Sequence, residues 1–365
     1  MRAPIVLTLS ALSILSVACS DSPDTSPSDS TPPPDAISDS ARIADASADV
    51  TARDASDAAV PTLPSCPTTG KGAILAPGPC FVFTPAQAGA STLGDNADVL
   101  QYALEPSVAP KGALVVQLNG SLGSPAGQIA DPTKNFYDAA ALAGFHVLGL
   151  AYKSTAIVGV LCNNAPACFG PTRRTIVTGA YAPGAPSSLA NTRLDEGIVM
   201  RVALDLKLLI AAHPGGGWET FVADATSNDP LKYVAWSKVI ASGHSQGGGH
   251  AAYLAQVVPL RRVVQLSSTC DESGGVPAPW TQGSQPWLVS PKTSFVGFAA
   301  PTIFTGPTPT SGDTTCPYHA AVWQAMGLDP SRMHDDAAVC TKFGNSHGAS
   351  IECVDNFPRW AGLLE

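Results

Sequence analysis

Residues 236–254 read WSKVIASGHSQGGGHAAYL, and the order of residue types in this stretch decides the fold prediction. Residues 236–242 predict a strand, and residues 247–257 are typical of a helix. Between them lies Gly243-His244-Ser245-Gln246-Gly247, a G-x-S-x-G pattern. The five letters alone are weak evidence, but their place between a strand and a helix is strong evidence. Such a turn lifts the Ser245 hydroxyl above a sheet, beside the N–H groups of a helix N-terminus.

Strand-like and helix-like patterns alternate on both sides of this stretch. Further strands are predicted at 112–118, 144–150, 262–267 and 301–306, and further helices at 133–143 and 191–213. Strands separated by helices of this length form βαβ units. We therefore expect an α/β fold with a mainly parallel central sheet and helices on both faces.

The stretch 236–254 resembles the nucleophile elbow of lipases and esterases in the α/β-hydrolase superfamily, and residues from about 110 to 360 match that superfamily in element order. The resemblance implies an α/β-hydrolase fold with Ser245 as the nucleophile. It also implies that the backbone N–H of Gln246 forms half of an oxyanion hole. The second donor would lie in the loop 119–122, at Ser121 or at Leu122, although a plain turn is the alternative interpretation of this loop.

A serine hydroxyl needs a base that takes its proton, and histidine is the usual base. Four histidines follow Ser245 in the chain, namely His250, His319, His334 and His347. His347 lies in a predicted loop of small residues near the C-terminus, where the chain order serine, acid, histidine places the base. We therefore predict His347 as the base, with a solvated loop histidine as the alternative.

The third residue of such a site is a carboxylate that orients the imidazole. Asp313 is the first choice, because it follows the predicted strand 301–306. Asp271 is the alternative acid, because it follows the preceding predicted strand, 262–267. The residue that is not the acid would be a turn or helix-cap aspartate. Residues 272–300, between these two strands, contain several aromatics and are expected to form either a lid or buried packing.

The N-terminus has the layout of an export signal. Residues 1–19 carry one Arg, then an uncharged apolar run that ends before Cys19, and Ser16-Val17-Ala18-Cys19 resembles a bacterial lipobox. We expect lipid attachment at Cys19, with an ordinary cleaved signal as the alternative. Residues 20–60 contain no aromatic residue and predict a disordered tether of Ser, Asp, Pro and Ala, followed by the hydrolase domain at 61–365.

Net charge and cysteine content narrow the possible class of protein further. The tether holds nine Asp and two Arg, so most of the net charge of −9 belongs to it, and no basic patch indicates nucleic-acid binding. Eight cysteines besides Cys19 predict up to four disulfides in an exported protein. Spacing suggests the pairs Cys66–Cys80 and Cys162–Cys168; the pairs Cys270–Cys316 and Cys340–Cys353 would fix the loops of the acid and the base. No metal site is expected, because no C-x-x-C or H-x-x-x-H pair occurs.

These features predict a secreted or envelope-anchored serine hydrolase that cleaves carboxylic esters without a cofactor. The expected substrate is a small-molecule or lipid ester, and membrane contact is expected only through the N-terminal lipid. The same residues also cleave amides and polyesters, so a peptidase or a polyester depolymerase is an alternative. A catalytically silent binding protein with the same fold is another.

Overall fold

The computed structural model describes residues 60–75, 77–92, 94–163, 165–282, 290–300, 302–303, 309–313, 315–335 and 346–365. The expected signal peptide with Cys19, and all of the expected tether except Val60, lie outside these residues. In the part of the chain that is described, no helix has both the length and the apolar character needed to cross a membrane.

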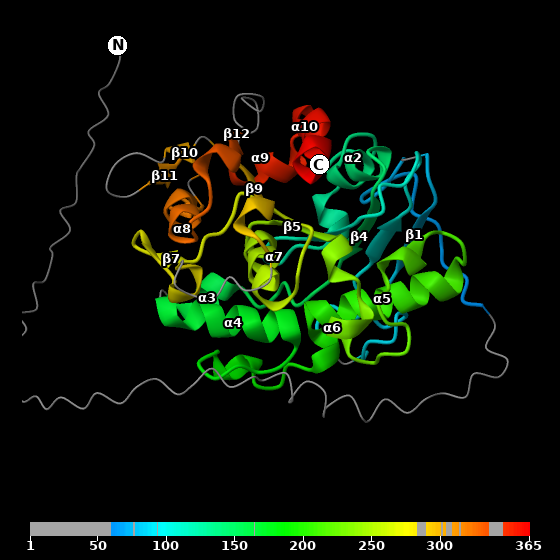
Figure 1. Cartoon of the computed structure of the whole chain (residues 1–365), viewed down its shortest axis with the longest axis horizontal. Coiled ribbons are helices and arrows are strands. Elements are labelled where there is room, and N and C mark those ends of the chain that lie inside the picture. The colour runs from blue at the N-terminus through cyan, green and yellow to red at the C-terminus, as the bar shows by residue number, and fades with distance from the viewer. Residues whose placement is uncertain are drawn as a thin grey trace, which may run out of the picture. The chain divides into compact units, whose positions relative to one another are not determined.

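An eight-stranded sheet forms the centre of the described chain, with the strand order β1-β2-β4-β3-β5-β6-β9-β12 (Figure 1). Its strands are β1 (Cys80–Phe83), β2 (Gln101–Leu104), β3 (Leu114–Leu118), β4 (His146–Leu150), β5 (Val239–His244), β6 (Arg262–Leu266), β9 (Phe295–Ala299) and β12 (Met333–Asp335). β2 pairs antiparallel with β1 and with β4, whereas all pairings from β4 to β12 are parallel. The C-terminal ends of the parallel strands therefore share one edge, which is where ligands bind in such sheets.

Helices cover both faces of this sheet, as the sequence predicted. On one face α2 (Phe136–Leu142) packs against α10 (Phe357–Leu364), and on the other α4 (Pro166–Thr178) packs against α5 (Ile198–Ala212) and α7 (Gln246–Val257) (Figure 1). The shorter helices are α3 (Val158–Cys162), α6 (Pro230–Tyr233), α8 (His319–Ala325) and α9 (Ser346–Glu352).

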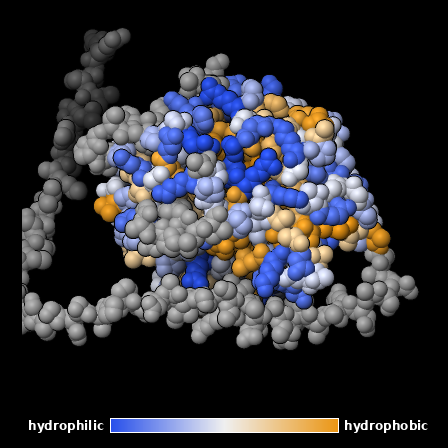
Figure 2. Space-filling model, in the orientation of Figure 1, coloured by the Kyte–Doolittle hydropathy of each residue, from blue (hydrophilic) through white to orange (hydrophobic). Residues whose placement is uncertain are grey.

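Side chains of the central strands alternate between two apolar cores. In β3, Leu114, Val116 and Leu118 belong to the core that α4, α5 and α7 cover, while Val115 belongs to the core under α2 and α10. All four are fully buried. A strand that is apolar on both faces is typical of a parallel sheet covered by helices on both sides. On the outer face shown in Figure 2, hydrophobic residues are interspersed with hydrophilic ones.

The strand that follows β6 in the sheet differs from the sequence prediction. A strand was predicted at 301–306, but β9 at Phe295–Ala299 is the one that pairs with β6 and β12. Thr302–Ile303 (β10) pairs instead with Thr310–Ser311 (β11) in a separate two-stranded sheet. Both stretches are apolar, so periodicity could not separate them. Packing does, because β9 places Gly297 against the side chains of Trp323 and Met333, where a side chain would not fit.

The described aromatic residues of 272–300 belong to the interior. Phe295 and Phe298 lie in β9, and these two residues and Trp280 are buried. The buried-packing interpretation is therefore correct for these three residues, and Trp287 lies outside the described residues. Another short hairpin, β7 (Glu272–Ser273) with β8 (Val276–Pro277), opens this segment.

Within the described residues, three disulfides are formed: Cys66–Cys80, Cys162–Cys168 and Cys270–Cys316. All three pairs are among those suggested by the sequence. Cys353 is also disulfide-bonded, and Cys340, its expected partner, lies outside the described residues. Disulfides of this number are consistent with an exported protein.

Candidate active site

Ser245 lies at a strained turn between β5 and α7. Its backbone angles, φ 54° and ψ −122°, fall in a region that L-residues rarely adopt. Its N–H donates to the carbonyl oxygen of Leu266 in β6 at 2.9 Å. A side chain at Gly243 would collide with the backbone of Gly247, and a side chain at Gly247 would collide with that of Leu118. Both glycines of the motif are therefore required by the close approach of strand, turn and helix.

His347 lies between Ser245 and Asp313. Its Nε2 is 2.7 Å from Ser245 Oγ, and its Nδ1 is 2.7 Å from Asp313 Oδ2. The sequence suggested a loop at His347, but His347 is the second residue of α9. Asp313 follows β11, so the three side chains come from distant parts of the chain and meet at the carboxyl edge of the sheet.

The carboxylate of Asp313 is fully buried, and both of its oxygens are bonded. Oδ1 accepts the backbone N–H groups of Thr315 and Cys316 at 2.9 and 3.1 Å. Burial would raise the pKa of Asp313, but the hydrogen bond and charge of His347 and the two N–H donors outweigh it, so this pKa lies below its usual value. Asp313 is therefore ionised at neutral pH and holds a proton on Nδ1 of His347.

The alternative acid, Asp271, has other partners. Its two oxygens accept from Nη2 and Nε of Arg173 in α4 at 2.5 and 2.6 Å. The indole N–H of Trp280 donates to the same carboxylate at 2.8 Å. Between the two candidate acids, it is Asp313 that contacts His347, while Asp271 forms a buried ion pair.

The order of these residues in the sheet decides the fold. Along the chain, Ser245 comes after β5, Asp313 after β9 and β11, and His347 last, on α9. In the sheet, β4 lies between β2 and β3, so the strand order differs from the chain order at β3 and β4. A serine at a strand-to-helix elbow with this chain order is the hallmark of one architecture. The chain has the α/β-hydrolase fold.

No protein-family model matches the sequence, and no curated protein matches it either. Solved structures similar to this chain include an S-formylglutathione hydrolase from Agrobacterium tumefaciens, with 13% identity, 81% of this chain and 98% of that chain covered, and a TM-score of 0.39. A bacterial esterase shares 16% identity over 83% of this chain and 97% of that one, with a TM-score of 0.35. Esterase B from Lactobacillus rhamnosis shares 11% identity over 78% and 87%, with a TM-score of 0.33.

The loop expected to supply the second oxyanion donor lies beside Ser245. A side chain at Gly120 would come within 3.3 Å of Ser245 Cβ. The N–H of Leu122 donates to the carbonyl oxygen of Ser154 at 3.0 Å, so it is already occupied. Among the described residues, the backbone N–H groups of Ser121 and Gln246 have no acceptor. Of the two alternatives for the second donor, the geometry favours Ser121.

The side chain of Gln246 connects the start of α7 with the loop after β3 and with the segment after β4, a role that the sequence did not predict. Its Oε1 accepts the hydroxyl of Ser121 at 3.0 Å and the backbone N–H of Val158 at 2.9 Å. Its Nε2 donates to the carbonyl oxygen of Ser154 at 3.4 Å. The side chain of one candidate oxyanion residue thus holds the other.

Two further residues near Ser245 were missed by sequence reasoning. Arg173 donates from Nη1 to the carbonyl oxygen of Gln246 at 2.9 Å, in addition to its pair with Asp271. The Nε2 of His244 is 2.8 Å from the carbonyl oxygen of His347. His244 lies inside the G-x-S-x-G motif, which could have drawn attention to it, whereas nothing in the sequence around Arg173 connects it with the site.

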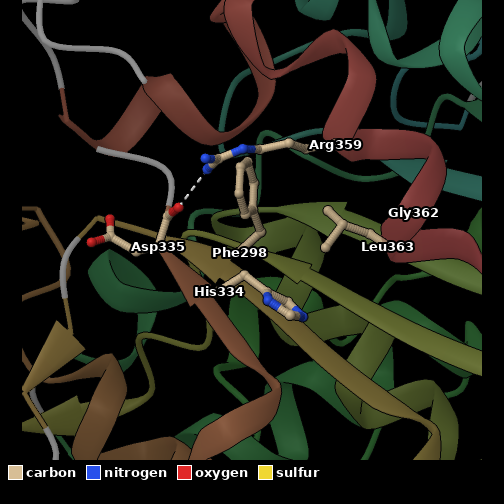
Figure 3. A pocket seen from close by; sticks show the side chains of 6 residues that line it. All are labelled: Phe298, His334, Asp335, Arg359, Gly362 and Leu363. Carbon is tan, nitrogen blue, oxygen red and sulfur yellow. Dashed lines mark hydrogen bonds between the residues drawn. The ribbon is translucent and has the colours of Figure 1, made fainter. Parts of the chain in front are cut away.

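The other three histidines after Ser245 have different surroundings. His250 is buried against the ring of Tyr152, and burial lowers its pKa well below the usual value. Burial lowers the pKa of His319 to about 4, and its Nδ1 is 3.2 Å from the Ser311 hydroxyl and from the Cys316 carbonyl oxygen. His334 lies in β12 and lines a hollow of about 450 Å³ against α10 (Figure 3).

The hollow at His334 contains none of the candidate site residues. Its other lining residues are Phe298, Asp335, Arg359, Gly362 and Leu363, with Arg359 donating to the backbone oxygen of Asp335 (Figure 3). A different cavity, of about 230 Å³, opens beside Ser245 and is lined by Ser121 and Gln246 among others. This second cavity is the one that can hold a molecule against the candidate nucleophile.

Proposed function

We propose that this protein is a serine hydrolase that cleaves carboxylic esters through an acyl-enzyme on Ser245. The observation that carries the proposal is the position of His347, with one ring nitrogen 2.7 Å from Ser245 Oγ and the other 2.7 Å from Asp313. An imidazole that bonds a hydroxyl and a buried carboxylate in this way is the arrangement of a general base and its orienting acid.

Each step of the reaction follows from these contacts. Asp313 keeps the proton of His347 on Nδ1, so Nε2 carries the lone pair that accepts the proton of the Ser245 hydroxyl. Ser245 Oγ then attacks the acyl carbon, and the ester C=O bond becomes a C–O⁻ single bond. His347 gives its new proton to the leaving alcohol oxygen, and the C–O bond to the alcohol breaks. Water then attacks the acyl carbon of the acyl-enzyme, with His347 taking its proton. The bond to Ser245 Oγ breaks as Oγ regains a proton from His347, and the acid is released.

The negative oxygen of this intermediate needs donors that are in place before the reaction. Gln246 and Ser121 line the cavity beside Ser245, and their backbone N–H groups have no other acceptor in the described chain. Removing one donor from such a hole costs about 10²–10³ in rate. No cofactor takes part in the proposed reaction, and the proposed substrate is a small-molecule or lipid ester.

The test uses the full chain with its disulfides intact. Hydrolysis of p-nitrophenyl butyrate is measured for the native protein, for Ser245→Ala and for Ser187→Ala, which changes an exposed serine in another part of the chain. We expect activity in the native protein and in Ser187→Ala and none in Ser245→Ala, and covalent labelling by a fluorophosphonate only where Ser245 is present. Hydrolysis of peptides but not of esters would make the protein a peptidase. If the protein shows no labelling and no turnover, it is a binding protein.

We further propose that the protein is exported and anchored by a lipid on Cys19. The support is the signal-like sequence of residues 1–19 and the disulfide content. Metabolic labelling of a bacterial host with an alkyne fatty acid tests the anchor. We expect label on the native chain and its loss in Cys19→Ser; label that persists in the variant would contradict the proposal.

A further inference from the structure

The cavity beside Ser245 lies on one side of the reacting groups. Ser121 and Gln246, the proposed oxyanion donors, line it together with Ser245, whereas His347 is not among its described lining residues. The leaving alcohol must lie near His347, because His347 protonates it. A cavity that borders the nucleophile and the oxyanion donors but not the base therefore lies on the acyl side of the scissile bond.

Two disulfide-braced segments form the walls of this cavity. Ile157, Val158 and Phe169 line one wall, and the bond Cys162–Cys168 joins the helices α3 and α4 that carry Val158 and Phe169. Cys270 and Thr315 also line the cavity, beside the bond Cys270–Cys316. Because each segment is cross-linked close to its lining residues, the walls resist the movement that a larger group would require.

The charged residues in the lining neutralise each other. Arg173 and Asp271 face the cavity, but each is nearly inaccessible, and they are joined by two short hydrogen bonds. Trp280 satisfies the carboxylate further, and the Gln246 carbonyl oxygen takes another N–H of Arg173. No uncompensated charge from this pair is left to attract an ionic acyl group, so the cavity suits an uncharged one.

The volume of the cavity indicates how large a group it can cover. At roughly 30 Å³ for each water-sized group, a cavity of about 230 Å³ holds roughly seven heavy atoms. We propose that this cavity is the acyl site and that the protein acts on esters of uncharged acyl groups of up to about six carbons, which with the carbonyl oxygen make up roughly seven heavy atoms. This inference rests on the proposed ester hydrolysis and adds its substrate class.

The half-buried side chain of Ile157 allows the assignment to be tested without disturbing the core. Hydrolysis of p-nitrophenyl acetate, butyrate and octanoate is compared for the native full chain and for Ile157→Trp. The matched control is Val160→Trp on α3, since Val160 is 70% exposed and does not line the cavity. Phe169→Ala serves as a variant with an enlarged cavity.

We expect kcat/KM for octanoate to be at least about tenfold below that for butyrate in the native protein. Ile157→Trp should lower kcat/KM for butyrate by about tenfold and leave acetate within about twofold, because only the longer chain reaches the wall. Val160→Trp should change neither, and Phe169→Ala should raise the ratio of octanoate to butyrate turnover. An optimum at octanoate, or an equal loss for acetate and butyrate in Ile157→Trp, would overturn the acyl-site assignment while leaving ester hydrolysis standing.

A second measurement tests which chain lengths the cavity accepts, independently of ester turnover. Reaction of Ser245 with p-nitrophenyl methyl-, propyl- and octylphosphonates is followed by intact mass, because the alkyl group on phosphorus takes the place of the acyl chain. Faster labelling by the methyl and propyl reagents supports the short acyl site even if no ester is turned over. Faster labelling by the octyl reagent overturns it, and absence of any labelling contradicts both the inference and the proposed function.

Discussion

His244 Nε2 lies 2.8 Å from the backbone carbonyl oxygen of His347, so the residue before the proposed nucleophile holds the main chain of the proposed base. Burial, and then the nearby His347 ring, lower the pKa of His244 to about 4. His244 is therefore neutral above that pH and donates from Nε2 to the carbonyl. The elbow and α9 are joined by this bond as well as by the bond between Ser245 and His347.

This contact predicts that His244 is a positioning residue. Replacing His244 by Ala removes a hydrogen bond worth about 1 kcal/mol and should lower kcat by about five- to tenfold with little change in KM. Gln at the same position can still donate and should recover part of the loss. Steady-state kinetics on butyrate esters checks both variants, and an equal loss in the two would show that the bond has no positioning role.

The two aspartates near the site should respond differently to the same substitution. Asp313→Asn should lower kcat by about 10⁴, because the neutral side chain no longer fixes the His347 tautomer. Asp271→Asn should instead lower the free energy of unfolding by about 3–5 kcal/mol, because it leaves the buried charge of Arg173 unpaired. Kinetics and urea unfolding on both variants separate these effects. The reverse pattern would make Asp271 the acid.

The Gln246 side chain should act on catalysis through Ser121. Ser121→Ala removes one hydrogen bond to Gln246 Oε1 while keeping the backbone N–H of Ser121, and Gln246→Met removes that bond together with those to Val158 and Ser154. Ser121→Ala should lower kcat by about fivefold and Gln246→Met by more, and the double variant should lose little more than Gln246→Met alone, because the bond to Ser121 is already absent there. Ser124→Ala, in the following turn, is the control and should leave kcat unchanged. Fully additive losses would argue against this coupling.

Removing the disulfide Cys270–Cys316 should affect activity as well as stability. The backbone N–H of Cys316 holds the carboxylate of Asp313, so Cys270→Ser with Cys316→Ser should lower kcat at a temperature where the protein remains folded. The loss of stability should be about 4 kcal/mol for this 46-residue separation. The matched control replaces Cys66 and Cys80, beside β1, by Ser; it should cost about 3 kcal/mol of stability and leave kcat intact.

Asp205 should make stability fall as pH rises towards neutrality. Burial raises its pKa to about 7, although the Gln101 hydrogen bond and the charge of Arg201 oppose this. Between the usual pKa of 3.8 and 7, the folded state keeps a proton that the unfolded state has lost, so the free energy of unfolding decreases across that range. Asp205→Asn should abolish a decrease on the order of 2–4 kcal/mol. Urea unfolding of both proteins at pH 4.5 and pH 8 measures the difference, and parallel pH profiles would contradict the prediction.

Local sequence predicted those parts of the fold in which one segment carries its own signal. The strand-turn-helix at Ser245 was predictable because the two motif glycines and the flanking apolar runs all lie within about twenty residues. The pairs Cys66–Cys80 and Cys162–Cys168 were predictable because close cysteines have few alternatives. In contrast, β9 was misplaced, because apolar runs on both sides of Pro301 satisfy the same pattern, and only the fit of Gly297 against Trp323 and Met333 chooses between them.

The sequence by itself determined the fold class, the position of Ser245 at a strand-to-helix turn, and the expected order of serine, acid and histidine. Only the tertiary structure decided that Asp313 rather than Asp271 contacts His347. It also decided that Gln246, Arg173 and His244 make hydrogen bonds to other residues of the site. The reason is physical. A turn is fixed by neighbouring residues, whereas a hydrogen bond between side chains a hundred residues apart depends on how the whole sheet and its helices pack.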